Sequence, residues 1–192
     1  MKLILCSSSA RRKELIKKLC LPYIVYTVNI DENIRTKIPA SLVTKLALRK
    51  ALAGAGRFRK GIAIGADTIV VLGDKIIGKP RDHRDAERIL KKLSGTVHKV
   101  YTGLALIDCA SGKLVVDYEV SGTKMRPLSV YEIKFYAGKH LDKAGAYAVQ
   151  EKDDAVVEKI YGDYYNVVGL PLEKLKLLLK MFGKNLDFDC GA

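Results

Sequence analysis

Apolar residues recur along the chain with two periods, one typical of buried strands and one typical of amphipathic helices. Residues 62–72 are almost continuously apolar, which is the pattern of a strand covered on both faces of a sheet. Residues 82–93 place Ile89, Leu90 and Leu93 at helical spacing, with charged residues on the other positions. The same patterns predict further strands at 2–6, 23–29, 97–108, 113–127, 144–150 and 155–160, and further helices at 11–20, 41–56, 129–138 and 171–182. Strands and helices in this alternation predict a mixed α/β sheet.

The composition is that of an ordinary globular protein. Hydrophobic residues make up 48% and charged residues 29% of the 192 residues, which argues against disorder and is enough for one domain over 1–192. No apolar stretch approaches the length of a membrane span, and the run Leu3–Leu5 is too short for a secretion signal. The sequence therefore predicts a single cytoplasmic domain that does not enter a membrane.

The net charge of +13 favours a polyanionic partner, which is a nucleotide, a nucleic acid or an anionic membrane surface. Many lysines lie at helical spacing, for example Lys13 with Lys17 and Lys176 with Lys180. This spacing is equally typical of a solvated helix surface. Charge alone therefore does not choose among these partners.

A segment rich in hydroxyl groups joins the first strand to the first helix. Ser7, Ser9, Arg11 and Arg12 lie where the helix begins, and a helix N-terminus offers unpaired N–H groups and a positive dipole end. Guanidinium groups beside hydroxyls can hold phosphate oxygens through charge-assisted hydrogen bonds. The alternative is a basic helix with Ser9 as its N-cap.

Three acidic residues are candidates for chemistry. Asp31 and Glu32 lie in a polar loop ahead of Lys50 and offer the oxygen ligands that Mg²⁺ and Mn²⁺ prefer; the alternative is an acidic pair at the surface. Asp67 interrupts the apolar strand 62–72, and Gly65 beside it is expected to leave open space. Because an unpaired buried carboxylate is costly, Asp67 is expected to have a partner, a metal or a catalytic role.

Two further polar residues follow apolar strands. Lys79 stands between Gly78 and Pro80, which can hold it as a fixed cation; the alternative is an ordinary loop lysine. Gln150 ends the predicted strand at 144–150 and carries both donor and acceptor groups suited to a base edge; the alternative is a polar strand end.

In their order along the chain, these segments resemble the Maf family of nucleotide pyrophosphatases. The matching segments are Ser7–Leu15, Asp31–Glu32, Arg49–Ala51, Gly65–Thr68, Gly78–Pro80, Tyr101–Gly103, Ala144–Tyr147 with Gln150, and Asn166–Pro171. The resemblance covers residue 3 to about residue 182. It implies an elongated, twisted mixed sheet flanked by helices, with two lobes and a central nucleotide-binding cleft. It also implies a cytoplasmic enzyme that needs Mg²⁺, Mn²⁺ or Co²⁺ and often forms homodimers.

The resemblance implies hydrolysis of a nucleoside triphosphate to the monophosphate and pyrophosphate, with Asp67 as the general base. As a hypothesis, Glu32 and Asp67 lie near the metal. The charge that develops on the phosphates is then stabilised by Lys50, Lys79, Arg11 and Arg12. Ser7 and Ser9 also hold phosphate, and the base is selected by Arg11, Thr68 and Gln150.

The chain has the triplet Ala66–Thr68 and Gln150, and it has no Trp. These features resemble the branch of the family that hydrolyses dTTP and UTP. The resemblance implies that the enzyme removes unwanted or modified nucleotides. The alternatives are a pyrophosphatase for 7-methyl-GTP or another modified nucleotide, and a nucleotide-binding regulator of cell division. A nucleic-acid-binding module would show interleaved aromatic residues or a known binding signature. We therefore expect a nucleoside triphosphate as the partner, with neither nucleic acid nor membrane. Ala10 and Arg49 depart from the family pattern, and Arg49 is expected to alter metal or phosphate affinity.

Overall fold

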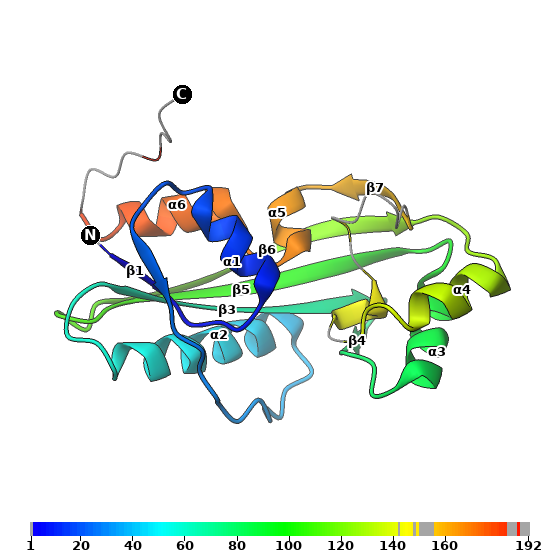
Figure 1. Ribbon diagram of the computed structural model, residues 1–192, viewed down its shortest axis with the longest axis horizontal. Helices are drawn as coiled ribbons and strands as arrows, with labels where there is room; N and C mark the ends of the chain where they lie inside the picture. The colour runs from blue at the N-terminus through cyan, green and yellow to red at the C-terminus, as the bar shows by residue number, and fades with distance from the viewer. Residues whose placement is uncertain (1, 142, 148, 150–155, 184–187, 189–192) are drawn as a thin grey trace. The chain divides into compact units, whose positions relative to one another are not determined.

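A computed structural model describes residues 2–141, 143–147, 149, 156–183 and 188 (Figure 1). Its strands are β1 (Leu3–Leu5), β2 (Tyr23–Val25), β3 (Ile62–Leu72), β4 (Lys75–Ile77), β5 (Val97–Asp108), β6 (Leu114–Met125) and β7 (Val157–Tyr161). Its helices are α1 (Ala10–Lys17), α2 (Pro39–Ala55), α3 (His83–Leu93), α4 (Val130–Ala137), the 3-10 helix η1 (Ala144–Ala146), α5 (Tyr164–Val168) and α6 (Leu172–Lys180). Among the described residues, no helix is both long enough and apolar enough to cross a membrane.

The described strands form one mixed sheet in the order β2-β1-β3-β5-β6-β7, with β4 paired to β3. Strand β1 runs parallel to β2 and to β3, whereas β3 and β4, like β6 and β7, pair antiparallel. The mixed α/β sheet expected from the sequence is thereby confirmed. The chain groups into two compact units, the first being Met1–Asp67, Thr102–Glu119 and Gly169–Ala192, and the second Thr68–Tyr101 and Val120–Val168.

In the first unit, helices cover both faces of the sheet. Helix α2 packs on one face, where small side chains meet apolar strand residues: Ile4, Cys6, Ala47, Ala51, Ala63, Ala105 and Ile107. Helices α1 and α6 lie on the opposite face (Figure 1). The buried residues Leu15 and Ile16 of α1, and Leu175 and Leu179 of α6, supply the apolar stripes that this position requires.

Two strand glycines let the backbone of α2 lie directly against the sheet. A Cβ atom at Gly65 would stand 2.0 Å from the carbonyl oxygen of Ala47, and one at Gly103 would stand 2.3 Å from that of Val43. Only glycine allows this approach, because any other side chain would overlap the helix backbone. The expectation of open space beside Gly65 is therefore wrong, since α2 fills it.

The second unit has its own apolar core beneath α3, α4 and η1. Its buried members include Val70, Ala86, Leu90, Leu93, Val100, Met125, Tyr136, Ala146 and Tyr147. The side chain of Asp82 caps α3 by accepting a hydrogen bond from the backbone N–H of Asp85 at 2.8 Å. Ser129 and Glu132 form a capping box that begins α4.

Several local predictions differ from the structure; for example, the strand predicted at 23–29 ends at Val25. The strand predicted at 144–150 is wrong for Ala144–Ala146, which form η1 because Gly145 and Ala146 take positive φ values of 77° and 58°. The helix predicted from Ser41 begins at Pro39, whose missing N–H is harmless in a first helical turn. The short helix α5 was not predicted.

The buried His98 gives the second unit a pH-dependent stability. Its Nε2 lies 2.7 Å from the hydroxyl of Tyr147, and burial lowers the pKa of His98 from 6.5 to about 4. Between these values the unfolded chain binds a proton that the folded chain does not, so stability falls as pH drops from 6.5 to 4. The shift corresponds to about 3 kcal/mol lost by the low end of this window.

We therefore expect His98→Gln, which keeps a polar partner for Tyr147 but does not titrate, to flatten this pH dependence. Urea unfolding at pH 7, 5.5 and 4.5 measures it for both proteins. The wild type should lose more stability than the variant over this range. Equal losses would show that His98 does not take up the proton on unfolding.

Candidate active site

The turn between β1 and α1 is shaped by its own hydroxyl groups. The backbone N–H of Ser9 donates to Ser7 Oγ at 3.2 Å, and Ser9 occupies the N-cap position with an extended backbone. The N-cap position of Ser9 agrees with the alternative of a basic helix that begins there, although the Ser9 side chain makes no capping hydrogen bond. The structure therefore retains the anion-attracting helix start expected from the sequence.

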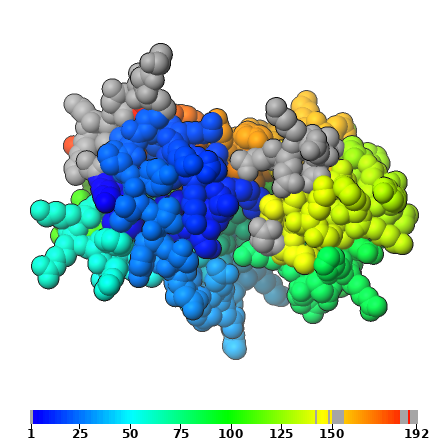
Figure 2. Space-filling view, in the orientation of Figure 1, coloured from blue at the N-terminus to red at the C-terminus, as the bar shows by residue number. Residues whose placement is uncertain are grey.

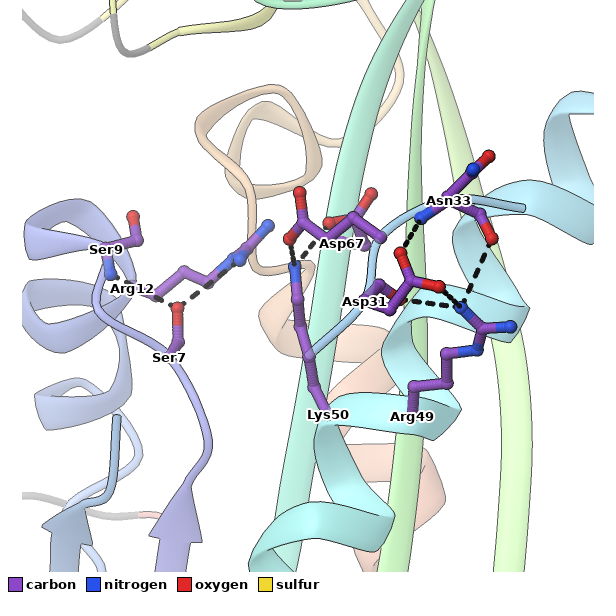
Figure 3. A network of polar contacts seen from close by, with 9 residues as sticks. Ser7, Ser9, Arg12, Asp31, Asn33, Arg49, Lys50 and Asp67 are labelled. Atoms are coloured by element: carbon purple, nitrogen blue, oxygen red, sulfur yellow. Dashed lines mark hydrogen bonds and ion pairs between the residues drawn. The ribbon is translucent and has the colours of Figure 1, made fainter. Parts of the chain in front are cut away.

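Arg12 is a buried cation beneath this turn. Its Nε donates to the carbonyl oxygen of Gly169 at 2.8 Å. One terminal nitrogen donates to Ser7 Oγ at 3.4 Å, which Figure 3 shows. Burial lowers the pKa of Arg12, while the charges of Asp67 and Glu32 act in the opposite direction. These two carboxylates therefore help to keep a desolvated guanidinium charged. Arg11, half-buried in the first turn of α1, adds a second cation nearby.

Lys50 joins the two acidic segments that the sequence singled out. Its Nζ lies 2.6 Å from Oδ1 of Asp67 and 2.9 Å from Oε1 of Glu32. The side chains of Lys50 and Asp67 are only 12% and 13% exposed, whereas that of Glu32 is 53% exposed. Helix α2 carries Lys50 to this place because Gly65, two residues before Asp67, lets the helix lie against β3.

The loop that carries Glu32 is held by Arg49. One terminal nitrogen of Arg49 donates to the carbonyl oxygen of Asp31 at 2.6 Å and to that of Asn33 at 3.4 Å (Figure 3). The backbone N–H of Asn33 in turn donates to Oδ1 of Asp31 at 2.9 Å. Arg49 therefore acts on loop backbone in this structure. Sequence reasoning missed Asn33, because a backbone acceptor carries no side-chain signal. Gly169 lies in the segment Asn166–Pro171 that the sequence singled out, but its role as the acceptor for Arg12 was not predicted.

The oxygen donors of Glu32 and Asp67 suit a divalent cation. Both carboxylates already approach one positive atom, Nζ of Lys50, so they converge on a common place. Hard cations of this kind are often held by one or two carboxylates together with substrate phosphates. Within the described part of the chain, no group of three His, Cys, Asp or Glu side chains is arranged to hold a metal without such help.

The remaining site candidates belong to the second unit or lie outside the described residues. Thr68 is half-buried on β3 directly after Asp67. Lys79 is exposed on the loop between β4 and α3, next to the buried Pro80. The backbone N–H of Gly145 donates to the carbonyl oxygen of Gly78 at 3.2 Å, which ties two of the singled-out motifs together. Gln150 lies outside the described residues.

The structure thus brings Ser7, Ser9, Arg12, Glu32, Lys50 and Asp67 together within the first unit. Figure 2 shows the residues of α1 at the surface of this unit, in blue. A helix start lined by hydroxyls, a buried guanidinium and a lysine between two carboxylates define an α/β protein equipped to handle phosphate groups. The chain belongs to the Maf family, whose sequence profile, described as Maf-like protein, matches residues 2–182.

Relatives with curated names support the same grouping. The chain is 46% identical to the dTTP/UTP pyrophosphatase of Desulforamulus reducens, over 94% of this chain and 96% of that protein. It is 44% identical to the protein of that name from Pelotomaculum thermopropionicum, covering 96% and 98% of the two chains. It is 42% identical to the one from Clostridioides difficile, covering 98% and 99%.

Among solved structures, the Staphylococcus aureus Ham1 protein shares the fold. The two structures superpose with a TM-score of 0.55 over 95% of this chain and 100% of the other, although the sequences are only 15% identical. This likeness concerns the fold alone.

Proposed function

We propose that this chain is a dTTP/UTP pyrophosphatase, which hydrolyses the nucleoside triphosphate to the monophosphate and pyrophosphate. The observation that carries the proposal is the largely buried pair of Lys50 and Asp67, 2.6 Å apart, in the same unit as the buried Arg12. The relatives named above, at 42–46% identity, support the reaction and the choice of substrates.

In the proposed reaction, Asp67 acts as the general base. The Lys50 ammonium, 2.6 Å from Oδ1, orients the Asp67 carboxylate, which can accept a proton. A water molecule attacks the α-phosphorus and gives its proton to Asp67. The bond from the α-phosphorus to the bridging oxygen breaks, and pyrophosphate leaves with the electron pair.

The cations of the site stabilise the charge that develops in this step. Arg12 is pre-oriented by its bonds to Gly169 and Ser7, so little rearrangement is needed when a phosphate arrives. We assign Arg11, Lys50 and Lys79 to the same task. Ser7 and Ser9 contribute their hydroxyls to the phosphates.

Glu32 and Asp67 are the residues we propose to hold Mg²⁺, Mn²⁺ or Co²⁺ together with the phosphates. When bound, such an ion neutralises phosphate charge and makes the α-phosphorus easier to attack. We assign base selection to Arg11, Thr68 and Gln150, since a Gln amide can pair with the edge of a pyrimidine.

A panel of triphosphates tests this function. Purified protein is incubated with dTTP, UTP, the other canonical triphosphates and 7-methyl-GTP, with each of the three metals or with EDTA, and pyrophosphate release is measured. We expect dTTP and UTP to be the preferred substrates and EDTA to abolish turnover. A preference for 7-methyl-GTP would overturn the substrate assignment, and no release from any triphosphate would overturn the enzymatic function.

A further inference from the structure

The loop of residues 78–82, here called the Lys79 loop, is fastened to the second unit on both sides of Lys79. Before Lys79, the carbonyl oxygen of Gly78 accepts a hydrogen bond from the N–H of Gly145. After it, Pro80 is buried, and its ring fixes the backbone direction. Lys79 itself is exposed. The position of the Lys79 ammonium group therefore depends first on the position of the Lys79 Cα atom, which these two restraints on the backbone determine.

Asp85 holds the far end of the Lys79 loop. Its Oδ2 accepts from the backbone N–H of Arg81 at 3.2 Å and from Nε of the same residue at 3.4 Å. Its Oδ1 accepts from a terminal nitrogen of Arg88 at 2.5 Å. The Asp85 side chain is only 9% exposed, whereas those of Arg81 and Arg88 are 79% and 60% exposed.

These contacts differ from those of an ordinary surface ion pair, which contributes little to the stability of the fold. The Asp85 carboxylate binds a backbone N–H of the loop, so it restrains the chain as well as a side chain. The hydrogen bonds from Arg88 and Arg81 also lower the pKa of Asp85, which keeps the carboxylate charged at neutral pH. The ring of Pro80 fixes its φ, so fewer backbone rotations lie between Arg81 and Lys79 to absorb a shift of the Arg81 backbone.

We propose that Asp85 is a positioning residue for Lys79, acting through the backbone of Arg81 and Pro80. This inference rests on the proposed function, in which Lys79 meets the phosphates. Its consequence is specific: loss of Asp85 should impair the reaction only as long as Lys79 is present.

A double-mutant cycle tests the proposal. The variants are Asp85→Ala, Asp85→Asn, Lys79→Ala and the double variant Lys79→Ala with Asp85→Ala, each assayed for kcat and KM with dTTP. The matched control is Glu158→Gln, which breaks an exposed ion pair to Lys124, 2.7 Å long, elsewhere in the second unit. Circular dichroism melting confirms that each protein is folded at the assay temperature.

We expect Lys79→Ala to lower kcat/KM about 100-fold and Asp85→Ala to lower it about 10-fold. The tenfold effect of Asp85→Ala lies within the range of interaction energies measured for residues that are in contact. In the Lys79→Ala background, Asp85→Ala should change kcat/KM less than about twofold. Asp85→Asn keeps one acceptor oxygen and should fall between the wild type and Asp85→Ala. Glu158→Gln should match the wild type.

Two results would overturn the positioning role while the proposed function stands. One is a wild-type rate in folded Asp85→Ala. The other is a full, independent loss when Asp85→Ala is added to Lys79→Ala. If Asp85→Ala does not fold, the same cycle with Asp85→Asn decides in the same way. A wild type without activity on dTTP would instead remove the proposed function and this inference together.

Discussion

Replacing Asp67 with Asn is expected to lower kcat for dTTP about 10²- to 10⁴-fold, the range that a general base contributes. The amide has the size and shape of the carboxylate, and its oxygen can still accept a hydrogen bond from Lys50, which lies 2.6 Å from Oδ1. The fold should therefore be retained, but the amide cannot take a proton from the attacking water. The measurement is steady-state pyrophosphate release, with unfolding by urea as the check on stability.

The matched control for this change is Asp31→Asn. Asp31 lies on the neighbouring loop, its side chain is 77% exposed, and its carboxylate lies 3.9 Å from Arg49. Removal of this exposed charge should change kcat less than about threefold, since exposed ion pairs are weak. If Asp67→Asn turned over dTTP at nearly the wild-type rate, another residue would have to serve as the base.

Replacing Gly65 with Ala is expected to destabilise the protein by about 3 kcal/mol or more, because it overpacks a tight contact between helix and strand. The added Cβ would stand 2.0 Å from the carbonyl oxygen of Ala47 and 2.6 Å from the backbone nitrogen of Ala51. Both are backbone atoms, so no side-chain rotation relieves the overlap and α2 must move away from β3. Because α2 carries Lys50, activity should fall as well.

Gly56→Ala is the control for this change. Gly56 lies directly after α2 and has a right-handed helical backbone, with φ −64°. The atom nearest to a Cβ added at Gly56 would be the Leu52 carbonyl oxygen, at 3.5 Å. Its effect on stability should stay within about 1 kcal/mol. Urea unfolding at neutral pH measures both variants. Equal stability of Gly65→Ala and the wild type would show that α2 does not lie as close to β3 as described.

The sequence predicted the long central elements well because their patterns are strong. The apolar run of β3 and the helical spacing of α3 each indicate one structure clearly, and the structure has them at Ile62–Leu72 and His83–Leu93. Residues 144–146 misled the prediction, since their apolar character fits a strand while Gly145 and Ala146 adopt left-handed backbone. Tertiary packing decides such a short segment, and local composition does not reveal it.

In the site, too, residues with an unusual sequence pattern were predicted, whereas contacts that depend on tertiary packing were not. Asp67 was found because a carboxylate in an apolar strand is unusual, and Arg12 because it stands at a helix start. The resemblance placed Lys50 in the same site and included Gly169 in a matching segment, but the contacts themselves were not predicted. Lys50 reaches Asp67 across 17 residues of sequence, and Arg12 reaches Gly169 across 157. These contacts depend on how α2 and α6 pack on the sheet, which local patterns of apolar and polar residues do not reveal.

Hydrolysis of dTTP in water enriched in ¹⁸O, with all products identified by mass spectrometry, shows directly which phosphorus atom the water attacks. Attack on the α-phosphorus should give pyrophosphate without label and thymidine monophosphate that carries one ¹⁸O. This product pair should become scarce with Asp67→Asn. Formation of thymidine diphosphate and orthophosphate, label in the pyrophosphate, or no turnover with Mg²⁺, Mn²⁺ or Co²⁺ would rule out the proposed attack of water on the α-phosphorus.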